Sequence, residues 1–285
     1  MSEPGRGPLV VTSLQNERVK AIRALEMRKE RKSTGLFVAE GASILMTARD
    51  NGWQLETLVA LSHVLGEGVA RDLARWVTQS GGDVMAVSTA VLGKLASKDN
   101  PQSLLGVFRQ RHASLPDSRS MVSGSGGSGS GGSGDVWLAL EEVRDPGNLG
   151  TIIRTVDAVG AKGIILVGNC CDPWSRECVR ATMGSIFAVP IARVERSEFL
   201  DWRQGWDGDV VATHLAASED FRTAKYQAPI LLMMGSEGPG LSDALNAVAT
   251  RRIKIPMAGR LDSLNLAVAT ALVLYQMRGA QLKLD

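Results

Sequence analysis

Short apolar stretches alternate with longer amphipathic stretches along most of the chain. Between residues 35 and 111, this alternation has the spacing expected of strands followed by helices. The pattern therefore predicts a small α/β domain. Its predicted strands cover residues 36–39, 55–61, 84–87 and 104–110, and its predicted helices cover residues 41–51, 69–79 and 88–97.

The same alternation resumes at residue 136 and continues into the C-terminal region. Strands that alternate with helices form parallel sheets with helices on both faces. We therefore expect a second, larger α/β domain. Its predicted strands are residues 136–141, 163–167, 189–193, 210–215, 228–234 and 252–255, and its predicted helices include residues 147–159, 175–182, 199–205 and 263–276.

Residues 123–134 consist only of glycine and serine, unlike the mixed sequence on either side. Such a segment is a flexible linker, native or engineered, and a random coil of this length reaches on the order of 20 Å. We expect it to mark the domain boundary and to let the first domain move relative to the second. The predicted organisation is a first domain at 1–119, a linker at 120–134 and a second domain at 135–285.

Composition narrows the class of protein without identifying it. The chain of 285 residues is long enough for two domains, and its net charge of +2 says little about partners. Its three cysteines, two of them adjacent at Cys170 and Cys171, give neither a disulfide framework nor a zinc-ligand spacing. We therefore expect a cytoplasmic protein without a metal. No apolar run approaches the length of a membrane span, so no membrane partner is expected.

Two turns rich in glycine and other small residues stand out near the C-terminal end, at residues 235–242 and 255–266. Each follows an apolar strand and opens a helix, with Asp262 or Ser263 as the expected N-cap of the last helix. Glycine allows the backbone to approach a ligand closely, and amides at a helix N-terminus bind anionic groups. Both turns are therefore candidate ligand-binding loops, and tight packing in an α/β core is the alternative.

A third stretch, residues 141–166, helps to interpret these two turns. Residues 141–166 contain Asp145-Pro-Gly-Asn-Leu-Gly followed by Arg154, and they resemble the first motif of the SpoU-type (TrmH-like) RNA 2′-O-ribose methyltransferases of the SPOUT superfamily. The two turns resemble that family's second and third motifs, in the same order. The resemblance covers about residues 135–280, roughly half of the chain.

This resemblance implies a fold, a cofactor and a reaction. In the family, the C-terminal segment is threaded through a loop to give a deep trefoil knot, which general topological rules would not predict. The two knotted turns hold S-adenosylmethionine, and two subunits pair to complete the site, so a homodimer is expected. The reaction is methyl transfer to a ribose 2′-hydroxyl of RNA, which requires the methyl group close to the oxygen and a route for the hydroxyl proton.

The resemblance assigns Arg154 to the family's catalytic arginine. Arginine is nearly always protonated and is therefore a poor base. The family proposal is that a phosphate of the bound RNA assists it as a base, whereas we favour an Arg154 that binds that phosphate and orients the hydroxyl. A surface salt bridge with Asp157 or Glu141 is the structural alternative.

Other polar positions match the three motifs as well. The resemblance adds four candidate catalytic residues, Asn148, Glu237, Ser263 and Asn265. For the asparagines and Ser263 the alternative is helix capping, and for Glu237 it is a turn residue at a helix N-terminus. The cofactor positions implied by the motifs are Gly235, Gly238, Ile255, Met257 and Leu264, with Thr213 and Leu215 as weaker candidates at an earlier strand end.

The first domain carries the one clear concentration of basic residues. An amphipathic helix is predicted within residues 11–33, with Val19, Ile22, Leu25 and Met27 as its apolar stripe. A basic face attracts phosphates, although a solvated surface helix has the same pattern. The predicted RNA-binding residues are Arg18, Lys20, Arg28, Lys29, Arg31 and Lys32.

Two further stretches, residues 37–41 and 102–107, resemble the N-terminal domain of many SpoU-type enzymes. That domain is similar to a small ribosomal RNA-binding protein and grips the RNA substrate. Glu40 and Gly41 are either a functional turn or a helix N-terminus. The polar loop at 99–102 either faces RNA or is an ordinary connection.

Together these features predict an S-adenosylmethionine-dependent RNA 2′-O-methyltransferase that acts on ribosomal RNA. The same reaction on transfer RNA and a non-catalytic RNA-binding protein of the same fold are the alternatives. A generic nucleotide-binding α/β enzyme is not favoured, because the chain has neither a Gly-x-Gly-x-x-Gly turn with its later acid nor a phosphate-binding loop with Gly-Lys-Ser/Thr.

Overall fold

The computed structural model describes residues 8–96, 102–117 and 135–283. The chain forms two compact units, which we call unit 1 and unit 2. Unit 1 comprises residues 1–110 and 172–188, and unit 2 comprises residues 111–171 and 189–285.

This division differs from the one expected at the linker. Residues 111–117 belong to unit 2, where the Trp202 indole donates a hydrogen bond to the Pro116 carbonyl (2.9 Å). Residues 172–188 were expected in the second domain but belong to unit 1. The glycine and serine segment at 123–134 lies outside the described residues.

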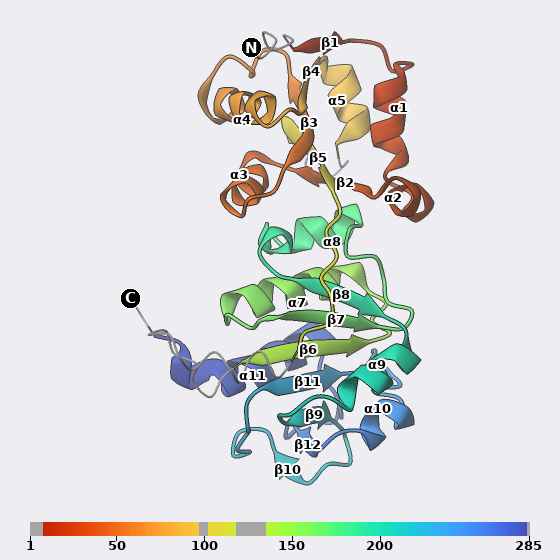
Figure 1. Cartoon of the computed structure of the whole chain (residues 1–285), viewed down its shortest axis with the longest axis vertical. Coiled ribbons are helices and arrows are strands. Elements are labelled where there is room, and N and C mark those ends of the chain that lie inside the picture. The colour runs from red at the N-terminus through yellow and green to blue at the C-terminus, as the bar shows by residue number, and fades with distance from the viewer. Residues whose placement is uncertain (1–7, 97–101, 118–134, 284–285) are drawn as a thin grey trace. The chain divides into compact units, whose positions relative to one another are not determined.

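Unit 1 is built on a five-stranded mixed sheet with the order β1-β4-β3-β5-β2 (Figure 1). β4 is parallel to β1 and β3, and β5 is antiparallel to β2 and β3. Four of the strands were predicted, and β1 was not, because three residues are too few to show alternation. The strands are β1 (Leu9–Val11), β2 (Leu36–Glu40), β3 (Leu55–Leu61), β4 (Asp83–Val87) and β5 (Leu104–Arg109).

Two helices replace the single basic helix expected within residues 11–33. Asn16 caps the first helix, because its side chain accepts from the Arg18 amide, and that helix ends at Leu25. Met27 is extended (φ −86°, ψ 130°) and starts the second, which ends at Gly35 (φ 67°). The helices of unit 1 are α1 (Glu17–Ala24), α2 (Arg28–Thr34), α3 (Ala42–Asp50), α4 (Gly68–Gln79) and α5 (Thr89–Leu95).

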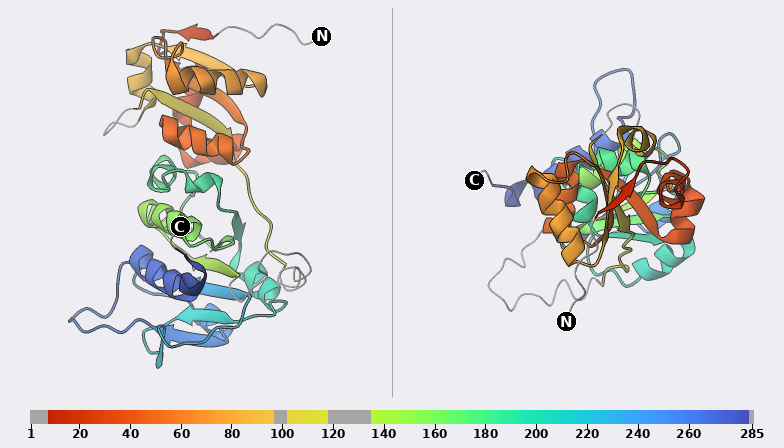
Figure 2. Two further views of the ribbon diagram at one scale, coloured as in Figure 1. Left: turned by 90° about the vertical axis from the view of Figure 1, so that its left-hand side faces the viewer. Right: turned by 90° about the horizontal axis from the view of Figure 1, so that it is seen from above.

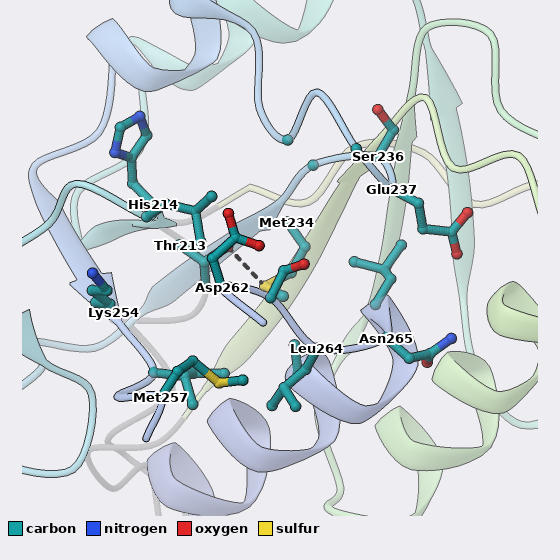
Figure 3. A pocket seen from close by; sticks show the side chains of 18 of the residues that line it. Thr213, His214, Met234, Ser236, Glu237, Lys254, Met257, Asp262, Leu264 and Asn265 are labelled. Carbon is teal, nitrogen blue, oxygen red and sulfur yellow. Dashed lines mark hydrogen bonds between the residues drawn. The ribbon is translucent and has the colours of Figure 1, made fainter. Parts of the chain in front are cut away.

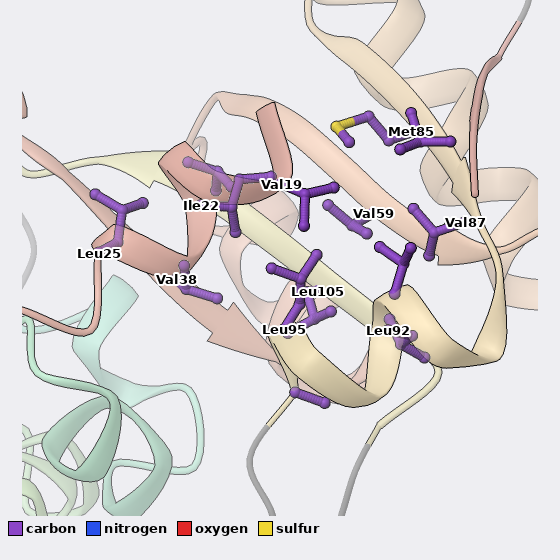
Figure 4. Close-up of a cluster of buried hydrophobic side chains, with 14 residues drawn as sticks. Val19, Ile22, Leu25, Val38, Val59, Met85, Val87, Leu92, Leu95 and Leu105 are labelled. Atoms are coloured by element: carbon purple, nitrogen blue, oxygen red, sulfur yellow. The ribbon is translucent and has the colours of Figure 1, made fainter. Parts of the chain in front are cut away.

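One face of this sheet is covered by α1 and α5 (Figure 4). Val19, Ile22 and Leu25 form the predicted apolar stripe and lie in the core, whereas Met27 is exposed. The strands contribute alternate residues, as expected where one face of each strand is buried. The remaining core residues of this face are Val11, Val38, Val59, Met85, Val87, Val91, Leu92, Leu95, Ala96, Leu105 and Val107.

Residues 172–188 complete unit 1. They contain α8 (Arg176–Ala181) and the short 3₁₀ helix η1 (Ser185–Phe187). Trp174 and Phe187 pack with aromatic rings of β2, β5 and Trp53, and the Trp53 indole donates to the buried Phe187 carbonyl (2.8 Å). The segment therefore belongs to the core of unit 1 rather than to its surface.

Unit 2 contains a seven-stranded sheet with the order β10-β12-β9-β11-β6-β7-β8 (Figure 1). All of its neighbouring strands are parallel, which confirms the predicted sheet type. Three neighbouring strands, β11, β6 and β7, are buried along their whole length, as expected between two layers of helices. The strands are β6 (Val136–Glu141), β7 (Gly163–Val167), β8 (Ile191–Val194), β9 (Val210–Thr213), β10 (Glu219–Asp220), β11 (Ile230–Met234) and β12 (Arg251–Lys254).

Helices cover both faces of this sheet. Figure 2 shows α7 and α11 on one face and α9 on the other, where Phe199 of α9 and Leu245 of α10 enter the core. Asn265 caps α11 by accepting from two amides, so the expected cap at Asp262 or Ser263 is wrong. The helices are α7 (Pro146–Ala158), α9 (Arg196–Arg203), α10 (Asp243–Ala247) and α11 (Leu266–Arg278). Within the described part of the chain, no helix has the length and apolarity that a membrane crossing requires.

Candidate functional site

A pocket of about 530 Å³ opens where β12, β9 and β11 end, three neighbours in the sheet (Figure 3). The carboxyl ends of parallel strands lie at one edge of a sheet, and ligands of α/β proteins bind at this edge. The volume is in the range of sites for drug-sized ligands. The lining includes all seven predicted cofactor positions, Thr213, Leu215, Gly235, Gly238, Ile255, Met257 and Leu264.

The first turn allows no side chain at its start. A Cβ at Gly235 would lie 1.9 Å from the Gly240 carbonyl carbon and 2.1 Å from the Leu241 nitrogen. The Gly240 amide donates to the Ser236 carbonyl (3.0 Å), so the turn closes on itself. Gly238 and Gly240 have φ values of 95° and 72°, which favour glycine. Bare backbone at Gly235, Gly238 and Gly240 therefore forms part of the wall of the pocket, together with Ser236 and Glu237.

Several lining residues were not singled out from the sequence. Among them are Ser236, Lys254 and His214, and Asp262, which was considered only as a helix cap, lines the pocket as well. Nδ1 of His214 accepts from the Ala216 amide (3.1 Å). Lys254 is the last residue of β12, and His214 directly follows β9. Their position at a strand end is the sequence signal that could have identified them as lining residues.

Side chains from all three motifs meet beside the pocket. The Asn265 amide donates to Asn148 Oδ1 (3.0 Å), and the Asn148 amide donates to a carboxylate oxygen of Glu237. Asn265 Oδ1 accepts from the first amides of α11, which fixes the orientation of its side chain. A carboxylate offers only acceptors to the Asn148 side-chain amide, so this chain of bonds also fixes which way that amide points.

These contacts decide between the sequence alternatives for the asparagines. Asn148 is not the cap of α7. The Asp145 side chain accepts from the backbone amide of Asn148 (2.6 Å), so Asp145 is the cap. Asn265 both caps α11 and contacts Asn148. Glu237, Ser263 and Asn265 line the pocket, whereas Asn148 adjoins it through its two partners.

Arg154 lies apart from this group. It is exposed on α7, does not line the pocket, and forms no hydrogen bond or ion pair with any described residue. The alternative salt bridge is absent, since Glu141 pairs with Arg196 (2.8 Å). Six residues separate it from Asn148, which in a helix is about 9 Å along the axis and a different side. A single chain therefore does not assemble Arg154 with the pocket.

A second hollow, of about 560 Å³, runs over α7 and α11. Its rim carries apolar side chains that are unusually exposed, with Val268 and Tyr275 each at 50% and Leu272 at 42%. Only one side of α11 is buried within this chain. Thr151 and Thr155, which flank Arg154 on α7, line the same hollow, which we call the α7–α11 groove.

The predicted RNA-binding residues of unit 1 separate into two groups. Arg18, Lys20, Arg28, Lys29 and Lys32 are exposed. Arg31 is only 5% exposed, donates to the Leu25 and Glu26 carbonyls (both 2.8 Å), and pairs with Asp172 (2.7 Å). The assignment of Arg31 to RNA binding is therefore wrong, because its side chain is buried and bonded inside unit 1.

Glu40 also has an internal partner. Its carboxylate pairs with Arg176 of α8 (2.9 Å), and both side chains are largely buried. Gly41 has a φ of 99° at the start of α3, a conformation suited to glycine. These features favour the structural interpretation of this turn. Asp99, Asn100 and Pro101 of the polar loop lie outside the described residues. Among the described residues, no group of three His, Cys, Asp or Glu is suited to hold a metal ion.

Comparison with known proteins gives consistent matches for both parts of the chain. Residues 135–275 match the SpoU rRNA Methylase family, and residues 16–106 match the MRM3-like substrate binding domain. An uncharacterized tRNA/rRNA methyltransferase of Synechocystis is 31% identical, with 95% of this chain and 94% of that protein covered. The Bacillus subtilis 23S rRNA (guanosine(2553)-2′-O)-methyltransferase RlmP is 26% identical, with 94% and 99% covered.

Solved structures are similar in fold to this chain over nearly its whole length. The AdoMet-bound rRNA methyltransferase from Sinorhizobium meliloti has a TM-score of 0.85 and 44% identity, with 96% of this chain and 98% of that chain covered. The SpoU methyltransferase AviRb from Streptomyces viridochromogenes, in complex with AdoMet, has a TM-score of 0.79 and 28% identity, with 94% and 98% covered.

Proposed function

Since this chain belongs to the SpoU rRNA methylase family, we propose that the pocket at the ends of β9, β11 and β12 binds S-adenosylmethionine for 2′-O-methylation of ribosomal RNA. The chain is an S-adenosylmethionine-dependent RNA 2′-O-methyltransferase. The observation that carries the choice of pocket is that all seven motif-derived cofactor positions line it.

The residues of the pocket fit this cofactor. Gly235 brings bare backbone to the wall, and Ile255 and Leu264 would hold the adenosine with Thr213 and Leu215. The carboxylates of Glu237 and Asp262 also reach the lining, where negative charge suits a cationic ligand. When bound, the cofactor supplies a methyl group activated by its positively charged sulfur.

The remaining polar residues would prepare the ribose. Asn148, held by Glu237 and Asn265, keeps one amide hydrogen for a ribose or phosphate oxygen. Ser263 offers a hydroxyl on the same rim. Arg154 would bind the phosphate beside the target ribose and so orient the 2′-hydroxyl, an arrangement in which positioning supplies much of the acceleration.

A homodimer would supply what a single chain lacks. The exposed apolar α7–α11 groove suits an interface between two copies, since large apolar patches on a surface mark binding sites. Arg154 lies on the same helix as the groove and outside its own pocket. We therefore expect each subunit to present Arg154 to the pocket of the other. The trefoil knot of the family remains a prediction for unit 2.

The N-terminal part would grip the RNA. Its match to a substrate-binding domain and the exposed side chains of Arg18, Lys20, Arg28, Lys29 and Lys32 support this role. As domains along the sequence we retain 1–119 and 135–285, with the linker at 120–134 between them, although residues 172–188 fold with unit 1. A cytoplasmic location would suit both the ribosomal substrate and three cysteines without a disulfide.

Titration calorimetry with S-adenosylmethionine tests the cofactor site. Wild type should bind, and Gly235→Trp should not, because an indole would fill the turn and the pocket. Circular dichroism should show that the variant is folded. Binding by a folded Gly235→Trp variant would place the cofactor elsewhere.

Methyl transfer to purified ribosomal and transfer RNA tests the substrate. We expect incorporation into ribosomal RNA at a nucleotide that resists alkaline cleavage, because a 2′-O-methyl group blocks that reaction. Equal incorporation into transfer RNA would contradict the proposed substrate.

A further inference from the structure

Glu141, the last residue of β6, is a buried carboxylate that none of the roles described above uses. Its side chain is 3% exposed, and burying a charge is costly unless it is paired and hydrogen-bonded. Both oxygens of its carboxylate accept hydrogen bonds. The Ser242 amide donates to Oε2 (2.7 Å), the Ser242 hydroxyl donates to Oε1 (2.7 Å), and Arg196 Nε donates to Oε1 (2.8 Å).

Two of these three bonds come from the last residue of the glycine-rich turn at 235–242. The turn leaves the sheet after Met234, which pairs in register with Leu140 of β6. It returns at Ser242, beside the next residue of β6, Glu141. Glu141 therefore fastens the end of the turn, two residues after Gly240.

The middle of the same turn lies at the pocket. The closed turn presents Ser236, Glu237, Gly238 and Gly240 to the lining, and Glu237 also holds Asn148. A turn that opened at Ser242 would move the wall of the pocket and the partner of Asn148 together. The free protein then binds only in its closed fraction, and the apparent dissociation constant rises as that fraction falls.

We propose that Glu141 is a positioning residue for the cofactor, which it serves by fastening the turn through Ser242. Glu141 does not line the pocket. It acts through its carboxylate charge, because its two oxygens accept from three donors. This inference rests on the proposed cofactor site. A neutral glutamine would offer one acceptor oxygen and would set its amide against at least one of those donors.

Glu142 provides a matched control. It also pairs with Arg196 (3.1 Å) and with Arg144 (3.0 Å), but it has no contact with the turn. Glu141→Gln should raise the dissociation constant for S-adenosylmethionine at least about tenfold in calorimetry, and Glu142→Gln should change it less than about twofold. Hydrogen exchange of the Ser242 and Gly240 amides in the free protein should accelerate only in Glu141→Gln.

A merely structural role would give a different result. Misfolding of part of the sample that does not reverse during the titration would lower the number of binding sites per chain and leave the dissociation constant of the folded fraction unchanged. That result, or a Glu141→Gln constant within twofold of wild type, would overturn the proposal. Loss of binding in Gly235→Trp alongside normal binding in Glu141→Gln would reject this inference while leaving the cofactor site intact.

A second variant covers the case in which Glu141→Gln does not fold. Ser242→Ala leaves the charge of Glu141 and its pair with Arg196 but removes the hydroxyl contact. Since Ser242 also caps α10, Ser175→Ala, which removes the comparable cap of α8, is its control. We expect weaker cofactor binding, by about threefold or more, only for Ser242→Ala. Equal constants for the two variants would overturn the proposal.

Discussion

Two arginines that the sequence associates with RNA lie in opposite surroundings. Arg31 of unit 1 is enclosed by carbonyl groups and Asp172, and residues 172–188 around it are packed against aromatic rings. The Arg154 side chain of unit 2 is exposed and has no hydrogen bond or ion pair with any described residue, and its helix lines a groove rimmed by exposed apolar side chains. The first region is completed within one chain, whereas the second has the features of a surface that a substrate and a second subunit complete.

Removal of Arg154 should have the largest effect on activity. Arg154→Ala should lower kcat by about 10²-fold or more, the cost of misplacing a reacting group. Folding stability should stay within about 0.5 kcal/mol of wild type, because an exposed side chain without partners is lost. Single-turnover methylation and urea unfolding measure the two effects.

Arg154→Lys distinguishes between the possible roles of this side chain. It retains the positive charge but not the planar pair of donors that matches a phosphate. Activity close to that of the alanine variant would favour bidentate phosphate binding. An alanine variant that kept more than a tenth of the wild-type kcat would contradict any direct role.

Removal of Arg31 should act on stability instead. Arg31→Met leaves Asp172, whose side chain is only 12% exposed, without its ion pair and should lower the free energy of unfolding by about 3 kcal/mol. Tryptophan fluorescence during urea unfolding follows this change, since Trp53 and Trp174 lie in the same unit. Lys32→Ala, an exposed change on the same helix, is the control and should cost less than about 0.5 kcal/mol. A stable Arg31→Met variant with weakened RNA binding would reverse our assignment.

The α7–α11 groove gives the smallest expected change in free energy. Leu272→Asp places a charge on its rim and should weaken self-association at least about tenfold in sedimentation experiments, since charge is depleted at interface cores. Leu9→Asp is the control, because Leu9 has the same 42% exposure on the edge strand of unit 1. A Leu272→Asp variant that sediments like wild type would show that this groove is not the interface.

Patterns that are local in sequence were sufficient for much of the fold and the pocket. The alternation of strands and helices predicted the parallel sheet, and the three motifs predicted residues that the structure brings together at one edge. Asn265, rather than Asp262 or Ser263, caps the last helix, because all three residue types cap equally well and the backbone geometry decides.

Properties that depend on distant partners were not predictable. Arg31 has the same charge as its exposed neighbours on α2, and its partner Asp172 is 141 residues away. No periodicity distinguishes a buried arginine from an exposed one in such a helix. The same holds for Glu141, whose partner Ser242 is 101 residues away and lies at the end of a different motif.

The chain passes between the two units three times, after residues 110, 171 and 188. Unit 1 is therefore not contiguous in the gene, and its aromatic core is complete only when Trp174 and Phe187 have been synthesised. Its first 110 residues leave the ribosome without those two rings and without Asp172. A gene fragment that stops at the glycine and serine segment would encode an unfinished protein, and exchange of the N-terminal domain between relatives requires residues 172–188 to be exchanged with it.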